Sequence, residues 1–200
     1  MGHVMILNTT QHITGHVLIR DAETGAVLVD KMNAINFENF SVSLAQTLAN
    51  RPDSWIQEMA FGNGGATVSG TGTITYLPPN VLGQTAQLYS ETYSKVVDDQ
   101  NPYNLDPKKN YIKVAHSAGT TYSDVIVTCN LDLGEPAGQD AFDTATSVQS
   151  SYVFSELGLR AFGPAGPGKG RLLTHVIFSP VQKSLNRQIE VVYTIRIQTV

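Results

Sequence analysis

The sequence is poor in charged residues and in cysteine. Charged residues make up 15% of the 200 residues, whereas soluble domains usually carry about 25%. Such a weakly charged surface suits burial among partner molecules, and it also suits an ordinary secreted β-domain. Cys129 is the single cysteine, which excludes a disulfide within the chain and an all-cysteine metal site. Because Cys129 lies in an alternating apolar run, we expect it to be a buried core residue.

Basic runs and long apolar runs are also missing. The formal net charge is −4, and nucleic-acid grooves usually show a basic stripe, so we do not expect direct nucleic-acid binding. The first residues have no basic region followed by an apolar core, and no apolar stretch is long enough to span a bilayer. We therefore expect no signal peptide and no membrane segment in a chain made in a reducing cytoplasm.

Alternation of apolar and polar residues dominates the remaining pattern. It is clearest in residues 188–198 and 122–133, where Ile126 is the one exception, and this period of two is typical of half-buried strands. Further strands are expected at residues 14–20, 26–35, 55–61, 71–77, 87–97, 111–115, 152–159 and 171–178. We expect the last of these to pair with residues 188–198 as the closing hairpin.

Residues 36–50 follow a helical period instead. Apolar residues recur there every four positions, at Phe40, Leu44 and Leu48. The pattern predicts an amphipathic helix at about residues 39–50. Asn39 or Ser41 would cap its start, and Pro52 would end it.

About eight to ten strands and one helix favour a mainly β fold, either an antiparallel β-sandwich or a barrel. The stretches 98–110 and 134–149 are expected to be long loops. Residues 1–200 are expected to form a single β-rich domain. Residues 1–13 are a candidate N-terminal arm that orders only on a neighbouring molecule.

Patterns that carry catalysis or bind cofactors and metals are missing. The glycine-rich residues 62–65 lack the lysine of a phosphate loop. His12 and His16 would share one face of a strand, but surface histidines need no metal. A glycosidase would use two carboxylates, and nothing selects a pair among Glu58, Glu91, Asp124 and Glu156. We therefore expect no enzyme and no catalytic, cofactor-binding or metal-binding residues.

Several aromatic and apolar residues are candidates for a protein interface instead. They are Tyr89, Tyr93, Tyr103, Leu105, Phe142 and Phe162. Tyrosine is common at interfaces because it has an apolar body and a polar tip, but it is also a good strand former, and both interpretations stay open. Long loops in a compact domain are usually functional or disordered, so the two loops are the segments expected to reach a neighbour.

Five phrases, taken together, resemble a family of tailed-bacteriophage virion structural proteins. They are KMNAI at 31–35, MAFGNGG at 59–65, LYSETYSKVVD at 88–98, YVFSELGL at 152–159 and LLTHVIFSP at 172–180. The resemblance implies a non-catalytic subunit of the virion, assembled in the host bacterial cytoplasm. It implies a symmetric ring of copies at the head-to-tail neck or collar, beside portal, adaptor or tail proteins. The baseplate or tail and the capsid surface are the alternative positions.

A second hypothesis comes from another functional class. The sandwich-like strand pattern, the tyrosines and the single tryptophan, Trp55, also suit a carbohydrate-binding or glycan-degrading β-sandwich. That hypothesis predicts aromatic side chains exposed on one sheet face or loop rim. A buried Trp55 would count against it.

Overall fold

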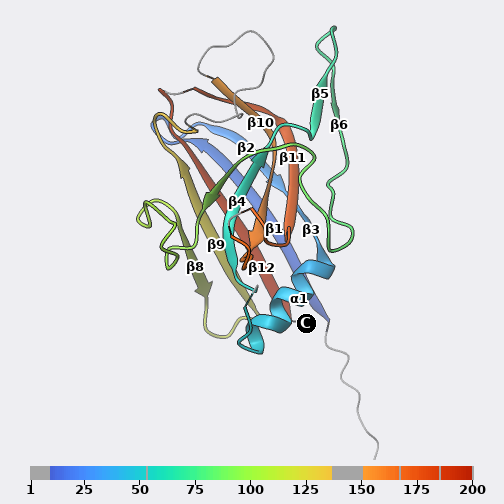
Figure 1. Ribbon diagram of the computed structural model, residues 1–200, viewed down its shortest axis with the longest axis vertical. Coiled ribbons are helices and arrows are strands. Elements are labelled where there is room, and N and C mark those ends of the chain that lie inside the picture. Colours follow the sequence, from blue (N-terminus) through green and yellow to red (C-terminus); the bar gives the residue numbers. More distant parts are fainter. Residues whose placement is uncertain (1–9, 53, 137–150, 167, 185, 200) are drawn as a thin grey trace, which may run out of the picture.

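Two antiparallel sheets of five strands each pack face to face (Figure 1). The computed structural model describes residues 10–52, 54–136, 151–166, 168–184 and 186–199. The expected mainly β fold is confirmed, and its architecture is the sandwich, since the described strands do not close into a barrel. Residues 11–13 were expected in a free arm, but they belong to the first strand, where they pair with residues 197–199.

Sheet I has the order β2-β1-β12-β9-β8. Its strands are β1 (Gln11–Asp21), β2 (Val27–Met32), β8 (Tyr111–His116), β9 (Tyr122–Leu131) and β12 (Ile189–Thr199). Buried and partly exposed positions alternate along β12, as the sequence predicts. Cys129 and its neighbours Val127 and Leu131 are fully buried on the inner face of β9. Sheet I thus covers the core with one face and leaves the other to solvent.

Sheet II has the order β3-β11-β10-β4-β7. Its strands are β3 (Ala34–Ile35), β4 (Ile56–Gly62), β7 (Glu91–Val96), β10 (Ser151–Ala161) and β11 (Thr174–Ser184). Its inner face carries Met59 and Phe61 in the main core, whereas Ala60 on the outer face packs with Leu88 and Leu172 in a second small core. Sheet II is therefore buried on both faces, because the segments around residues 80–90 and 162–172 cover it.

The expected pairing of the last two strands is wrong. β11 and β12 lie in different sheets: β12 pairs with β1 and β9, while β11 pairs with β10 and β3. Both edges of β12 are thus occupied by long strands with eleven and ten paired positions. The connection between β11 and β12 crosses from one sheet to the other, so sequence proximity misled the prediction.

Helix α1 (Phe37–Leu48) lies across one end of the sandwich (Figure 1). It begins two residues earlier than predicted, because Asn36 rather than Asn39 or Ser41 caps it, accepting a hydrogen bond from the Asn39 backbone N–H at 3.0 Å. The predicted apolar stripe is only partly correct. Phe40 is buried, but so are Asn39 and Ser43, while Leu48 is exposed.

A two-stranded hairpin of β5 (Ala66–Val68) and β6 (Ile74–Tyr76) forms a separate small sheet. It projects beyond the sandwich at the end away from α1 (Figure 1). The sequence predicted one longer strand over residues 71–77 and missed β5. The described residues contain twelve strands, more than the eight to ten expected.

The loop at residues 98–110 joins the edge strands β7 and β8, and so connects the two sheets along one side. Asn104 holds it together by donating from Nδ2 to the backbone oxygen of Asn110 at 2.8 Å and to that of Asp98 at 3.2 Å. The other predicted loop, at residues 134–149, lies outside the described residues from position 137 onward.

Candidate functional site

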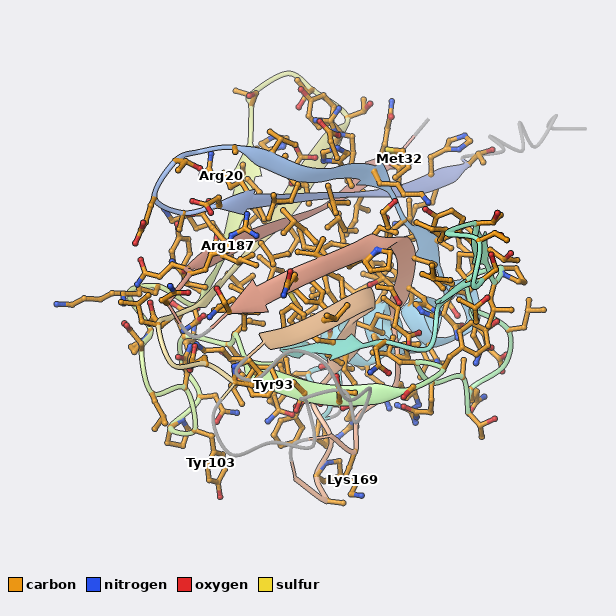
Figure 2. All side chains as sticks on the ribbon, turned by 90° about the horizontal axis from the view of Figure 1, so that it is seen from above. Arg20, Met32, Tyr93, Tyr103, Lys169 and Arg187 are labelled. Carbon is orange, nitrogen blue, oxygen red and sulfur yellow. The ribbon has the colours of Figure 1, made fainter. Side chains whose placement is uncertain are left out.

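The predicted interface residues do not form one patch. Tyr103 and Leu105 are 67% and 96% exposed on the loop at residues 98–110, and Figure 2 shows Tyr103 pointing away from the body of the protein. Tyr93 is half-buried, with its ring 6.0 Å from that of Phe61. Tyr89 is partly exposed and donates its hydroxyl to the backbone oxygen of Pro78 at 2.7 Å. These residues therefore lie on separate surfaces.

The two remaining interface candidates have different outcomes. Phe162 is half-buried and stacks on Trp55, with ring centroids 4.6 Å apart and an interplanar angle of 26°. Phe142 lies outside the described residues. Trp55 is itself 42% exposed, so the aromatic pair forms a partly open ledge. A buried Trp55 would have counted against glycan binding, and Trp55 is not buried.

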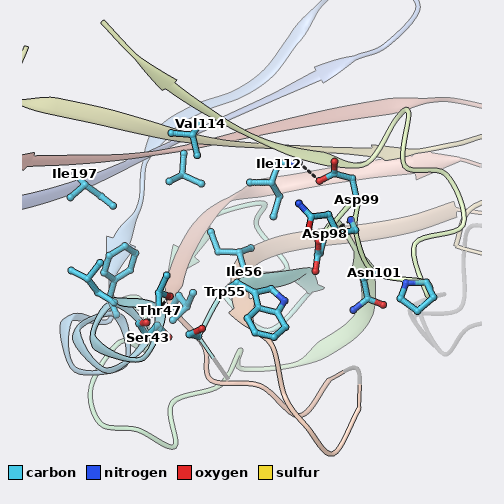
Figure 3. Close-up of a pocket in the computed structure, with 17 residues that line it drawn as sticks. Ser43, Thr47, Trp55, Ile56, Asp98, Asp99, Asn101, Ile112, Val114 and Ile197 are labelled. Atoms are coloured by element: carbon cyan, nitrogen blue, oxygen red, sulfur yellow. Dashed lines mark hydrogen bonds between the residues drawn. The ribbon is translucent and has the colours of Figure 1, made fainter. Parts of the chain in front are cut away.

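Beside this ledge lies a cavity of about 790 Å³ between the two sheets and α1 (Figure 3). Its walls are mainly apolar and come from α1, the start of β4, the loop at residues 98–110, β8, β9, Leu173 and β12. The apolar lining includes Phe40, Leu44, Ile112, Val114, Val125 and Ile197. A volume of this size falls within the range of about 300–1,000 Å³ that is typical of ligand sites.

A few polar groups stand among these apolar walls. Asp98 and Asp99 line the mouth (Figure 3), and each carboxylate already accepts a backbone hydrogen bond, from Gln100 at 3.0 Å and from Ile112 at 3.3 Å. Ser43, which also lines the cavity, is 5% exposed, and its Oγ has no hydrogen-bond partner among the described residues. The cavity therefore offers an apolar surface with one unsatisfied buried hydroxyl.

A buried carboxylate on the outer face of sheet II accepts four hydrogen bonds. Glu156 accepts from the backbone N–H groups of Gly64, Ser90 and Tyr89 at 2.8–2.9 Å, and pairs with His175 Nε2 at 2.9 Å. Burial alone would raise the pKa of Glu156, but the His175 bond and the three backbone bonds outweigh it and lower that pKa. The carboxylate therefore fastens the covering segment to the sheet.

The hydrogen bond at Nδ1 of His175 shows which of its two ring nitrogens carries the proton. The backbone N–H of Asn80 donates to Nδ1 at 2.8 Å, so Nδ1 carries no proton and Nε2–H donates to Glu156. Both side chains of this pair are fully buried. A substrate has no access to them, and their role is structural.

A second buried cluster centres on Arg160, which pairs directly across the sheet with Glu58. Its Nη1 donates to Glu58 and to Glu91 at 3.0 Å each, and its Nη2 donates to Gln87 at 3.1 Å and to Glu91. Glu58 also accepts from the backbone N–H of Gly168 at 2.8 Å. Burial opposes the charge of Arg160, but the two carboxylates outweigh it and raise the arginine pKa.

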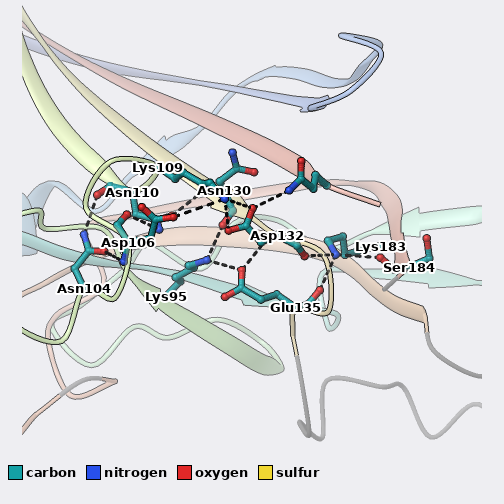
Figure 4. Close-up of polar contacts among 11 residues, drawn as sticks. Lys95, Asn104, Asp106, Lys109, Asn110, Asn130, Asp132, Glu135, Lys183 and Ser184 are labelled. Atoms are coloured by element: carbon teal, nitrogen blue, oxygen red, sulfur yellow. Dashed lines mark hydrogen bonds and ion pairs between the residues drawn. The ribbon is translucent and has the colours of Figure 1, made fainter. Parts of the chain in front are cut away.

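Lysines and acidic residues close the end of the sandwich opposite α1 (Figure 4). Lys183 Nζ donates to the backbone oxygens of Asp132, Glu135 and Ser184 at 2.7–3.0 Å. Lys95 Nζ forms an ion pair with the Glu135 carboxylate. Burial lowers the pKa of Lys183 to about 8. This end is thus filled by satisfied charges, whereas the α1 end keeps its apolar cavity.

The four carboxylates that were open as glycosidase candidates all have cationic or imidazole partners. Glu58 and Glu91 bind Arg160, Asp124 binds Arg196, and Glu156 binds His175. No group of three or more His, Cys, Asp or Glu side chains in the described part of the chain could hold a metal ion. No described helix is long and apolar enough to cross a membrane.

Exposed apolar side chains gather in two places outside the cavity. A shallow hollow of about 520 Å³ at the β2–β3 edge is lined by Met32, Phe37 and Leu82, all of which are exposed. The hairpin of β5 and β6 exposes Val68, Ile74 and Tyr76. It belongs to a segment, residues 59–90, that contains no Asp, Glu, Lys, Arg or His.

The chain matches no protein-family model, no curated protein and no solved structure. Sequence reasoning missed the cavity and the three buried charged clusters. The one signal that pointed toward them was the set of charged residues within strongly apolar strands, such as Glu58 in β4 and Arg160 in β10.

Proposed function

We propose that this chain is a non-catalytic structural subunit of a tailed-bacteriophage virion that assembles into a symmetric homo-oligomer. The observation that carries the proposal is the uncharged hairpin of β5 and β6, which projects from the sandwich. The hairpin is a sheet of two strands only, which pair solely with each other in the described structure. At its base the hairpin touches β11, where the Tyr76 hydroxyl and Ser179 Oγ share a hydrogen bond of 2.7 Å. A two-stranded hairpin with little further packing is marginally stable in water, so contact of its exposed part with a neighbouring molecule would stabilise it.

The hairpin also lacks the features that keep monomers apart. Proteins usually protect open strand edges with lysine, proline or other charged residues, and residues 66–76 contain none of these. Val68 and Ile74, paired across the hairpin, both point apolar side chains into solvent. Closed rings of identical copies would cover these strand edges and apolar side chains, and would leave no free edge to which further copies could add.

The position within the particle rests on the sequence resemblance alone. Among the candidates, the head-to-tail neck or collar is the position that we propose, with the baseplate or tail and the capsid surface as alternatives. Partners would then be copies of this chain and virion proteins such as portal, adaptor or tail proteins. Proteomics of purified particles and localisation of the density in an intact particle test the placement.

The assembly itself is tested by light scattering and negative-stain microscopy of the full chain. We expect rings, and we expect Val68→Lys to raise the dissociation constant of the oligomer by about tenfold or more, because the substitution buries a charge in the contact. Val27→Lys is the matched control, since Val27 and Val68 are 60% and 59% exposed. A wild-type chain that stays monomeric and is missing from particles contradicts the proposal.

A glycan-binding role is the second candidate, and Trp55 favours it. Sugar rings stack on exposed aromatic faces, and the ledge formed by Trp55 and Phe162 stands beside the polar mouth residues Asp98 and Asn101. A glycan array with the wild type and Trp55→Ala tests this role. Binding that is lost in the variant supports it, and an array with no binding removes it.

A further inference from the structure

We infer that the cavity beside α1 receives residues 4–7 of a neighbouring copy, which read Val-Met-Ile-Leu. The inference rests on the proposed assembly and names a second contact between subunits, besides that of the β5–β6 hairpin. Protein interiors are close-packed, and voids larger than a water molecule are few. An apolar hollow of about 790 Å³ at the end of the core is therefore a surface that gains stability when apolar side chains enter it.

The hydroxyl of Ser43, in the wall of the cavity, is a buried polar group that a peptide occupant could satisfy. A buried hydroxyl without a hydrogen bond costs about 1–3 kcal/mol, and no described residue bonds to Ser43 Oγ. A peptide segment brings backbone N–H and C=O groups together with its apolar side chains. A rotation of the Ser43 side chain toward the cavity would let one such group satisfy its hydroxyl, while the apolar side chains contact the apolar walls.

The N-terminal segment begins at the correct end of the sandwich. Within sheet I, Ile13 lies directly opposite Ile197, a residue of the cavity wall. Gln11, the first residue of β1, therefore lies at the end of the sandwich where the cavity opens. Nine residues precede the first described residue, Thr10, and an extended chain of that length reaches about 30 Å.

The direction of β1 favours a neighbour over the same chain. β1 begins at Gln11 at the α1 end of the sandwich, with its direction along the sheet (Figure 1). Only residues 8–10 separate the apolar run from β1, and this short connection would have to reverse the chain for it to enter its own cavity. A neighbouring copy stacked at this end meets the segment without a reversal.

The charges of the two surfaces agree with this contact. Residues 1–9 contain no Asp, Glu, Lys or Arg, and His3 is their only titratable side chain. Burial of residues 4–7 would therefore bring no charged side chain into the apolar hollow, where an unpaired charge is strongly unfavourable. Asp98 and Asp99, the charged residues that line the cavity, stand at its mouth and keep their own backbone hydrogen bonds.

Disulfide trapping in the full chain tests the contact, because the natural thiol does not interfere. Cys129 is fully buried and burial raises its pKa to about 12, so it is unreactive at neutral pH. Ile6→Cys in one preparation is mixed with Thr47→Cys in another, since Thr47 lines the cavity. We expect a mixed disulfide dimer under mild oxidation. Thr24→Cys, an exposed threonine in the turn at the far end of β1, is the matched control and should not react.

Each outcome of the trapping experiment decides one statement. Light scattering on the same samples reports assembly independently of the disulfide. An oligomer that gives no mixed disulfide overturns the docking of residues 4–7 and leaves the proposed assembly standing. A monomer overturns both. A double variant carrying Ile6→Cys and Thr47→Cys that closes only within one chain overturns the exchange between copies.

A second measurement avoids any change to the sandwich. Ile6→Asp places a charge in the apolar run, and we expect the dissociation constant of the oligomer to rise about tenfold or more. Asn8→Asp adds the same charge outside the run and should change it less than about twofold. Equal effects of the two variants would show that charge alone, and not the apolar contact, governs assembly, and would overturn the inference.

Discussion

In sheet I the ion pair of Arg196 and Asp124 faces solvent, whereas in sheet II the ion pair of Arg160 and Glu58 is enclosed on all sides. Both are pairs between neighbouring strands with N–O distances of 2.8–3.0 Å. The difference lies in what covers each sheet. Sheet I turns its outer face to water, while the segments around residues 80–90 and 162–172 lie over sheet II. Similar side chains thus bind the covering segments in sheet II and form a surface ion pair in sheet I.

The largest effect that would test this comparison comes from Arg160→Met. The substitution leaves Glu58 and Glu91 without their buried cation, and breaking a buried pair typically costs about 3–5 kcal/mol of unfolding free energy. Arg196→Met removes a partly solvated pair, and its loss should be much smaller. Urea unfolding of both variants measures the difference. Equal losses of unfolding free energy would show that the segments over sheet II do not shield its ion pair from solvent.

A smaller effect is expected for Glu156→Gln. Whichever way the new amide turns, its NH₂ group faces two donors, either Gly64 and Ser90 or Tyr89 and His175. We expect a loss of about 2–3 kcal/mol, since bonds to charged groups are among the strongest in proteins. Glu190→Gln, on the solvent side of sheet I, is the control and should lose less.

The same variant has a defined pH dependence. The pKa of Glu156 is lowered in the folded protein, so its stabilisation is present above the ordinary value of 4.5 and is lost as the pH falls through the folded value. The stability difference between the wild type and Glu156→Gln should therefore shrink below about pH 4. A difference that stays constant in acid contradicts the assignment of a charged Glu156.

The smallest effect concerns the apolar core that the two sheets share. Burial raises the pKa of Cys129 from 9.0 to about 12, so the folded thiol keeps its proton while the unfolded thiol ionises. Stability from this group is complete below the ordinary pKa of 9.0 and is lost progressively as the pH rises above it. By about pH 10 the loss should reach roughly 1.4 kcal/mol. Alkaline urea unfolding of the wild type against Cys129→Ala isolates this loss, because other groups cancel. Parallel curves would contradict it.

The contrast between the sheets also explains what the sequence could predict. The alternation of apolar and polar residues along β12 and β9 predicted both strands and the burial of Cys129, because sheet I has one buried face and one solvent-exposed face. Both faces of sheet II are covered, so alternation did not predict that Glu58 and Glu156 are buried. The sequence also did not predict that Arg160 and His175 are their partners, because it does not indicate which strands become neighbours in the fold.

The candidate site was harder to predict than the strands. The cavity takes its walls from α1, the loop at residues 98–110 and strands of both sheets, and no local pattern connects such distant segments. Trp55 was recognised as a possible contact residue, but its stacking on Phe162 joins positions far apart in the chain. The cap at Asn36 and the burial of Ser43 likewise depend on how α1 crosses the end of the sandwich.

The uncharged stretch over residues 59–90 has a consequence for the medium in which copies of this chain can associate. Dissolved ions weaken attractions between exposed charges over a Debye length of about 10 Å at 0.1 M salt. The residues of β5 and β6 bring no such charges and no group that titrates near neutrality to a contact between copies. Lys31, whose Nζ lies 5.6 Å from the centre of the Tyr76 ring, is a cation beside them. A contact made by β5 and β6 alone would therefore change little in strength between dilute fresh water, a bacterial cell and a saline environment.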